Sequence, residues 1–328
     1  MRPASKVDVL LPEAIHPSTR ARLESLFELH LLNEASDPEE LLGRVGPRIR
    51  AVARGGQAAI DRRLMERLPA LEIVAVFGVG YDGIDLAYAR ERGIVVTNTP
   101  DVLSEEVADL TIGLLIMTLR ELARAERYVR AGDWARLGKF PPTRGSLRGR
   151  KAGILGLGRI GRAIARRLEA MGVPVAYHNR RRVPDAPYEY VASAVELAAA
   201  VDTLIAVLPG GAATDELVDA AVLRALGPEG VFVNVGRGST VDEDALIAAL
   251  RDGTIMAAGL DVFRNEPHVD PRFLGLDNVV LLPHVGSASL PTHDAMGELL
   301  VANLRSWFET GEPLTPVPET PWPVADRS

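Results

Sequence analysis

Three side chains in the last third of the chain are of types that suit carbonyl chemistry. His284 and Arg237 each follow a predicted strand, and Glu266 lies on the loop after Leu-Asp-Val-Phe. A histidine with a pKa near neutrality can supply the proton that a developing alkoxide needs. The planar guanidinium of an arginine can bind a carboxylate and an adjacent carbonyl oxygen together, a geometry that lysine cannot reproduce. These residue types would suit a site that transfers a proton to a carbonyl oxygen beside a carboxylate.

Glu266 is expected to act through His284. A carboxylate that accepts a hydrogen bond from an imidazole fixes its tautomer and raises its pKa, so the ring stays protonated. Each residue alone also has a structural interpretation: a strand-end histidine, a surface acid beside Pro267 and an arginine in a salt bridge. Their joint occurrence after a nucleotide-binding motif favours catalysis.

That motif is a glycine-rich turn between a strand and a helix. The run Ala152 to Leu155 leads into Gly-Leu-Gly-Arg-Ile-Gly, and AIARRLEAMG follows with helical apolar spacing. The first glycine allows a tight turn, the second lets a pyrophosphate approach the backbone and the third permits close helix packing. The expected cofactor-binding residues of the motif are Gly156, Gly158, Arg159, Ile160 and Gly161.

The next strand ends at Tyr177-His178-Asn179-Arg180-Arg181-Arg182, where an NAD-selective site usually has a carboxylate. Asn179 can still bond a ribose hydroxyl, and Arg180 and Arg181 can pair with a 2′-phosphate. The sequence therefore predicts NADP(H) in preference to NAD(H). The alternative is a solvated basic loop. His178 is interpreted as incidental.

The elements that position these residues form two α/β sets. Apolar runs at 7–11, 73–80 and 93–98 alternate with helical stretches, and six further runs follow at 152–156, 174–178, 203–208, 230–235, 256–262 and 278–282. This alternation predicts two Rossmann-like domains with doubly wound parallel sheets, the second of about six strands. A helix at about 289–309 could return to the first domain, which would then be discontinuous.

Between the two sets, Ser104 opens a single long helix that we expect to reach about residue 131. Residues 132–149 form an ordered excursion or linker. The proline-rich end GEPLTPVPETPWPVADRS is expected to be a loosely attached tail.

Composition excludes several kinds of partner. The chain has 328 residues, 47% hydrophobic and 25% charged, with a net charge of −7 and no cysteine. It is long enough for two domains, and its charge gives no global reason to bind nucleic acid or a membrane. The apolar stretch between Asp109 and Arg120 is too short to cross a bilayer. We expect no metal site, no signal peptide and a cytoplasmic location.

Six segments together resemble the signatures of one enzyme family. They are VFGVGYDGID, NTPDVLSEEVAD, GILGLGRIG, NVGRGSTVDEDAL, GLDVFRNEP and LLPHVGSAS. In order and over nearly the whole chain they are similar to the motifs of D-isomer-specific 2-hydroxyacid dehydrogenases, in particular NADP-dependent glyoxylate/hydroxypyruvate reductases. The resemblance implies an oxidoreductase that reduces a small 2-keto acid to the D-2-hydroxy acid, with Arg237, Glu266 and His284 as catalytic residues.

The resemblance also implies a domain division and further site residues. A substrate-binding domain of residues 1–100 with 288–328 and an NADP-binding domain of 101–287 would enclose a cleft. The N–H groups of Val79 and Gly80 would bind the substrate carboxylate, although a plain strand-end turn is the alternative. Residues implied to lie near the cofactor are Asp261, Leu208, Pro209 and Thr214. A homodimer is implied, with 104–150 as its contact region.

Three alternatives stay open. The substrate could be a bulkier keto acid such as phenylpyruvate, because the residues of the pocket wall, including 134–142, cannot be assigned to a substrate. Formate dehydrogenases and phosphoglycerate dehydrogenases of this fold fit less well, because of the Glu266 and His284 pair and the Asn179 position. The chain could instead be a nucleotide-sensing corepressor, since fold alone does not decide function.

Overall fold

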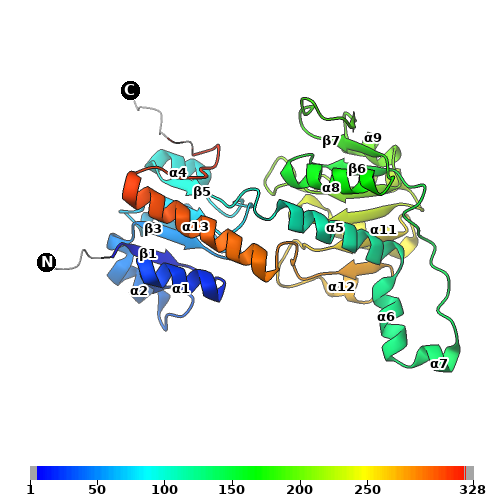
Figure 1. Cartoon of the computed structure of the whole chain (residues 1–328), viewed down its shortest axis with the longest axis horizontal. Coiled ribbons are helices and arrows are strands. Elements are labelled where there is room, and N and C mark those ends of the chain that lie inside the picture. Colours follow the sequence, from blue (N-terminus) through cyan, green and yellow to red (C-terminus); the bar gives the residue numbers. More distant parts are fainter. Residues whose placement is uncertain (1–5, 321, 323–328) are drawn as a thin grey trace. The chain divides into compact units, whose positions relative to one another are not determined.

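The chain folds into two compact units in a computed structural model that describes residues 6–320 and 322. Unit 1 comprises the described residues up to Leu103 and from Ser289 onward, and unit 2 comprises Ser104–Ala288. Both contain a parallel sheet with helices, as predicted (Figure 1). No helix within the described residues is long and apolar enough to span a membrane.

Unit 1 is built on a five-stranded parallel sheet in the order β2-β1-β3-β4-β5, which is a doubly wound arrangement. The strands are β1 (Asp8–Leu11), β2 (Glu28–Leu31), β3 (Ala51–Arg54), β4 (Ile73–Val76) and β5 (Val95–Thr97). The helices are α1 (Pro17–Leu26), α2 (Pro38–Val45), α3 (Arg62–Glu66), α4 (Leu86–Arg92) and α13 (Leu290–Thr310), with a short 3-10 helix at Gly46–Arg48.

Both faces of this sheet are buried, because alternate residues of a strand point to opposite sides. On one face, Val9 and Ile73 pack against Leu300 and Leu304 of α13. On the other, Leu10 and Val74 belong to a separate core cluster. Helix α13 lies beside α1 and crosses the strands of unit 1, although it follows unit 2 in the sequence (Figure 1).

Unit 2 is built on a seven-stranded parallel sheet in the order β12-β11-β10-β9-β6-β7-β8. The strands are β6 (Ala152–Leu155), β7 (Val175–His178), β8 (Glu189–Tyr190), β9 (Thr203–Ala206), β10 (Val231–Asn234), β11 (Ala257–Leu260) and β12 (Val279–Leu281). Each of the six predicted runs contains a strand, and the two-residue β8 is additional. The strand order reverses at β6, the switch point where nucleotides bind in such sheets.

The helices of unit 2 cover this sheet and include one segment that extends away from it. They are α5 (Ser104–Leu119), α6 (Leu122–Arg130), α7 (Asp133–Leu137), α8 (Arg159–Ala170), α9 (Ala194–Ala199), α10 (Ala220–Leu226), α11 (Glu243–Asp252) and α12 (Pro271–Leu274), with a 3-10 helix at Gly238–Thr240. Helix α5 packs against α8 and the sheet, whereas α6 and α7 bury no residue (Figure 1).

The prediction of a single helix from Ser104 to about residue 131 is wrong. The helix is interrupted between α5 and α6, where the backbone of Glu121 is left-handed with φ 48°. The chain returning at Gly145 packs so closely on this point that a Cβ there would lie 2.6 Å from the Leu119 carbonyl oxygen. Helix α5 therefore ends where the backbone crosses it, and the more polar α6 leaves the sheet.

The prediction of a loose C-terminal tail is wrong for the part that is described. Pro316 forms an antiparallel bridge with Thr97 at the edge of β5, and Val317 donates its N–H to the carbonyl of Val96 at 2.9 Å. The Val317 side chain is buried. Prolines exclude a helix here but not an extended edge segment, and the open edge of β5 supplies its partners. Residues 321 and 323–328 lie outside the described residues.

Candidate active site

Two predicted catalytic residues, Arg237 and His284, and the predicted cofactor residue Asp261 lie at the carboxyl ends of three neighbouring strands of unit 2. Arg237 follows β10, Asp261 follows β11 and His284 follows β12. These strands are adjacent and parallel, so their carboxyl ends share one edge of the sheet. Open α/β sheets bind their ligands at this edge.

His284 and Glu266 form a direct pair. The His284 Nδ1 atom lies 2.6 Å from Oε2 of Glu266, whose other oxygen accepts the Phe263 N–H at 2.9 Å. The Glu266 side chain is 13% exposed and that of His284 is 40% exposed. With Nδ1 directed at this carboxylate, Nε2 is the ring nitrogen that remains for a ligand. The pairing expected from the sequence is confirmed.

The backbone of His284 adopts a left-handed conformation with φ 54°. A non-glycine residue there costs about 1–2 kcal/mol, so its surroundings must hold it in place. Asp261 does so: its carbonyl accepts the His284 N–H, and its carboxylate accepts the N–H groups of Val285 and Gly286, each at 2.8 Å. Burial raises the pKa of Asp261, and the two amide hydrogen bonds oppose that shift.

Asp261 therefore holds the backbone of His284 and of the two residues after it in place. Family resemblance alone placed it near the cofactor, and the sequence reasoning missed its contacts with the turn at 284–286. Gly286 fits tightly against it, since an added Cβ would lie 3.0 Å from a carboxylate oxygen of Asp261. An acid directly after a buried strand, in Leu-Asp-Val, was the signal that could have indicated this role.

Arg237 is positioned by a buried asparagine that the sequence analysis did not single out. Asn234 accepts the Gly236 N–H through Oδ1 and donates Nδ2 to the Arg237 carbonyl, both at 3.0 Å. Thr240 donates its hydroxyl to the same carbonyl at 2.7 Å. The Arg237 side chain is half-buried and donates to the Gly236 carbonyl at 2.8 Å. A buried asparagine at a strand end could have indicated this turn.

The glycine-rich turn after β6 has the shape of a phosphate cradle. Gly156 has φ 101°, and a Cβ on Gly161 would lie 2.2 Å from the Gly156 carbonyl oxygen, so neither position accepts a side chain. A Cβ on Gly158 would meet open space, and helix α8 begins at the next residue, Arg159, followed by Ile160. The first amide groups of α8 thus face an unobstructed approach, which fits a pyrophosphate.

The residues after β7 divide between two roles. Asn179 accepts the Leu157 N–H through Oδ1 at 2.6 Å, so it holds the glycine-rich turn. Arg180 and Arg181 are exposed, and within residues 6–320 and 322 their guanidinium groups form no ion pair or hydrogen bond. Such guanidinium groups can take up a phosphate without giving up another contact.

The loop after β9 contains the other residues implied to lie near the cofactor. Leu208 is buried, and a Cβ on Gly236 would lie 2.7 Å from its backbone nitrogen. Thr214 closes the loop by donating its hydroxyl to the Pro209 carbonyl at 2.6 Å. The loop thus begins at the carboxyl end of β9, next to β6 in the sheet.

In unit 1, the predicted carboxylate loop follows β4. Gly78 has φ 141° and donates its N–H to the Thr99 hydroxyl at 3.0 Å. Among the described residues, the N–H groups of Val79 and Gly80 donate to no protein acceptor. Two successive amides without an acceptor have the character of an anion-binding nest.

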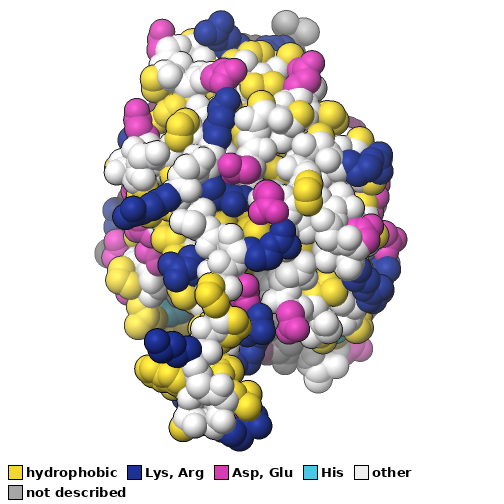
Figure 2. Space-filling view, turned by 90° about the vertical axis from the view of Figure 1, so that its right-hand side faces the viewer, with side chains coloured by type: hydrophobic (Ala, Val, Ile, Leu, Met, Phe, Trp, Pro, Cys, Tyr) yellow, Lys and Arg dark blue, Asp and Glu magenta, His cyan; other side chains and the backbone are white. Residues whose placement is uncertain are grey.

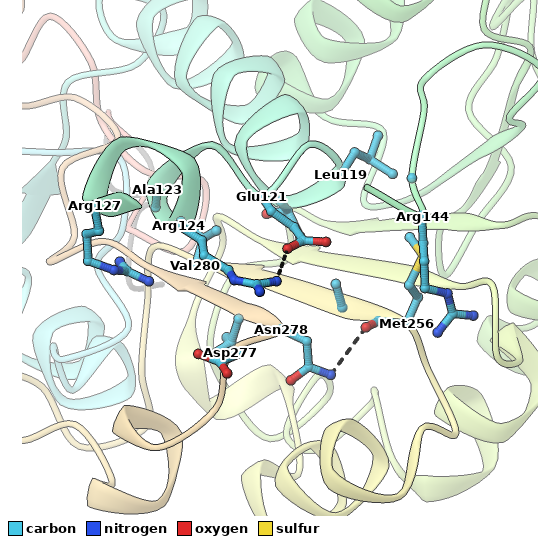
Figure 3. A pocket seen from close by; sticks show the side chains of 14 residues that line it. Leu119, Glu121, Ala123, Arg124, Arg127, Arg144, Met256, Asp277, Asn278 and Val280 are labelled. Atoms are coloured by element: carbon cyan, nitrogen blue, oxygen red, sulfur yellow. Dashed lines mark hydrogen bonds and ion pairs between the residues drawn. The ribbon is translucent and has the colours of Figure 1, made fainter. Parts of the chain in front are cut away.

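A cavity of about 230 Å³ in unit 2 lies away from these residues (Figure 3). It is lined by Met256 and Asn278, which lie at the amino ends of β11 and β12, and by the turn between α5 and α6. There Glu121 and Arg124 form an ion pair of 2.7 Å. Asp261 and His284 follow the opposite ends of the same two strands, so this cavity is separate from the candidate active site.

Comparison with known proteins agrees with this arrangement. Residues 112–286 match the model of the D-isomer specific 2-hydroxyacid dehydrogenase, NAD binding domain. The chain is 47% identical to glyoxylate/hydroxypyruvate reductase A of Arabidopsis thaliana, over 90% of this chain and 94% of that protein. It is 44% identical to hydroxyphenylpyruvate reductase of Plectranthus scutellarioides, with the same coverage of 90% and 94%.

A solved structure is similar over almost the whole chain. It is an NADPH-dependent glyoxylate/hydroxypyruvate reductase from Sinorhizobium meliloti in complex with NADP and malonate, 54% identical, with a TM-score of 0.93. The similarity covers 97% of this chain and 98% of that one. Fold, motif order and relatives agree, and the chain belongs to the D-isomer specific 2-hydroxyacid dehydrogenases.

Proposed function

We propose that this enzyme reduces small 2-keto acids, glyoxylate and hydroxypyruvate, to D-2-hydroxy acids with NADPH. The proposal rests on one observation: His284 Nδ1 lies 2.6 Å from Oε2 of Glu266, at the same edge of the sheet as Arg237. The names of relatives that are 47% and 54% identical support the same substrates.

Each residue has a defined part in this reaction. The reduced nicotinamide, when bound, supplies hydride to the carbonyl carbon. Arg237 binds the substrate carboxylate and polarises the carbonyl, and His284 donates a proton from Nε2 to the developing alkoxide. Glu266 orients the imidazole through its contact with Nδ1. The amides of Val79 and Gly80 bind the carboxylate, so that Arg237 does not carry that charge alone.

The cofactor is held by residues of unit 2. The amides of Gly158, Arg159 and Ile160 at the start of α8 bind the pyrophosphate. Asn179 binds the ribose through its amide nitrogen, and Arg180 and Arg181 bind the 2′-phosphate. Gly156 and Gly161 permit the close approach, while Leu208, Pro209, Thr214 and Asp261 line the remaining cofactor site. The relative crystallised with NADP supports this choice of cofactor.

One comparison supports a second class of substrate as the alternative. The 44% identical relative is named a hydroxyphenylpyruvate reductase, so bulkier 2-keto acids form the alternative. Initial rates with glyoxylate, hydroxypyruvate, phenylpyruvate and hydroxyphenylpyruvate, each with NADPH, decide between the classes. We expect the highest kcat/KM for the two small acids. Turnover of none of the four would contradict catalysis and favour nucleotide sensing.

We also propose a homodimer that uses α6 and α7. Both helices extend from unit 2, and hydrophobic side chains gather over this protruding segment (Figures 1 and 2). The large apolar side chains exposed there are Leu122, Val129, Trp134 and Leu137. Exposed apolar clusters of this kind mark interaction surfaces. The cytoplasmic location expected from the sequence stays a prediction.

A further inference from the structure

The predicted carboxylate-binding loop of unit 1, residues 78–80, is held in place by hydrogen bonds from residues 98 and 99 to its carbonyl groups. The Gly78 carbonyl accepts the Thr99 N–H at 2.9 Å, and the Val79 carbonyl accepts Nδ2 of Asn98 at 3.0 Å. In a trans peptide, the carbonyl and the following N–H point in opposite directions. These two bonds therefore aim the N–H groups of Val79 and Gly80 away from residues 98–99.

Asn98 is itself held by the C-terminal segment. Its carbonyl accepts the Thr315 hydroxyl at 2.6 Å, and its N–H donates to the Thr315 carbonyl at 3.3 Å. The same hydroxyl accepts Nδ2 of Asn303 at 2.9 Å. Asn303 lies on α13 and is fully buried, and its Oδ1 accepts the N–H groups of Leu314 and Thr315, each at 3.0 Å. The Thr315 hydroxyl thus joins Asn303 of α13 to Asn98, which in turn bonds the loop through its side chain.

A second contact ties the same segment to the same loop. Tyr81 follows Gly80 in sequence, and its hydroxyl donates to a carboxylate oxygen of Glu319 at 3.1 Å. Val317, between these contacts, is buried, and the Thr320 hydroxyl oxygen accepts the Val96 N–H at 2.9 Å. Residues 315–320 therefore fasten the carboxylate loop and the edge of β5 together.

We propose that Asn303, Thr315 and Asn98 form a hydrogen-bonded path that orients the Val79 and Gly80 amides toward a substrate carboxylate. The proposal rests on the proposed function, which assigns the carboxylate to these amides. Asn98 and Thr315 are positioning residues that touch no reacting atom. Their contribution is to substrate affinity, because the amides must already point at the anion when it arrives.

Thr315→Val tests the path, because valine keeps the shape of threonine and removes both hydroxyl bonds. If the loosened amides lose the equivalent of one ordinary hydrogen bond to the carboxylate, the glyoxylate KM and the inhibition constant of malonate rise about two- to tenfold. We expect kcat and NADPH affinity to stay within about twofold of the wild type. Hydrogen exchange of a peptide that spans residues 77–82 should accelerate.

Two companion variants make the test specific. Thr315→Ser retains a hydroxyl and should restore values near the wild type. Thr310→Val is the matched control, because the Thr310 hydroxyl bonds the Ser306 carbonyl and the Glu312 N–H but forms no hydrogen bond with Asn98, Asn303 or Thr315. Asn98→Ala removes only the side-chain contact with Val79 and serves if Thr315→Val does not fold.

The outcomes separate the two proposals. Unchanged malonate inhibition in both Thr315→Val and Asn98→Ala, in an enzyme that reduces glyoxylate, would overturn the path alone. Equal weakening in Thr315→Ser or Thr310→Val would also overturn it. A wild-type enzyme that reduces no keto acid would overturn the proposed function and this inference with it.

Discussion

Arg180→Ala isolates the contact on which the predicted preference for NADPH depends. Only the 2′-phosphate distinguishes NADPH from NADH, and the side chains placed to meet it are Arg180 and Arg181. Both are exposed and without another partner among the described residues. Removing one of them should therefore weaken the use of NADPH and leave the use of NADH nearly unchanged.

The magnitude follows from the type of bond and its exposure. A charge-assisted hydrogen bond contributes about 1.5–3 kcal/mol, which corresponds to about ten- to a hundredfold in kcat/KM. Exposure places the arginines at the low end of this range, because water and salt screen them. We expect the wild-type preference for NADPH to be about tenfold or more and Arg180→Ala to lose most of it.

The assay is a set of initial rates with both cofactors at saturating glyoxylate, repeated at higher ionic strength, which should lower the preference. Arg182→Ala is the matched control, since Arg182 is exposed beside the same loop but is assigned no phosphate contact. A wild type that prefers NADH, or an Arg180→Ala enzyme that loses both cofactors equally, would refute the reasoning.

Three further predictions concern other parts of the molecule. Arg237→Lys should lower kcat/KM for glyoxylate at least tenfold, because charge is kept and the forked geometry is lost; unchanged kinetics would remove that role. Burial and Glu319 raise the pKa of Tyr81 to about 12, so stability should fall as pH rises from about 10 to 12, and Tyr81→Phe should lose less in alkaline unfolding. Val129→Glu with Trp134→Glu should yield monomers in sedimentation, whereas a persistent dimer would place the contact elsewhere.

Much of the fold could be predicted because apolar periodicity and turn glycines are local signals. The six strands expected in the second sheet are present. In the nucleotide turn, Gly156 and Gly161 have no room for a side chain, and Gly158 faces open space. Strand β8 has only the residues Glu189–Tyr190 and no apolar run, so no periodic pattern announced it.

The errors arose where long-range contacts decide the conformation. The break at Glu121 depends on Gly145 crossing the end of α5, and the attachment of residues 315–320 depends on the open edge of β5. Neither partner is close in sequence. The roles of Asp261 and Asn98 were missed for the same reason, since their hydrogen-bond partners lie on other elements.

The measurement that tests the account most directly compares the wild type with His284→Ala in the reduction of glyoxylate by NADPH. The wild type should turn over, and the variant should lose about two to four orders of magnitude in kcat, the contribution of a positioned general acid. NADPH binding, followed by fluorescence titration, should be retained by the variant. A variant as active as the wild type would contradict the central claim that His284 supplies the proton.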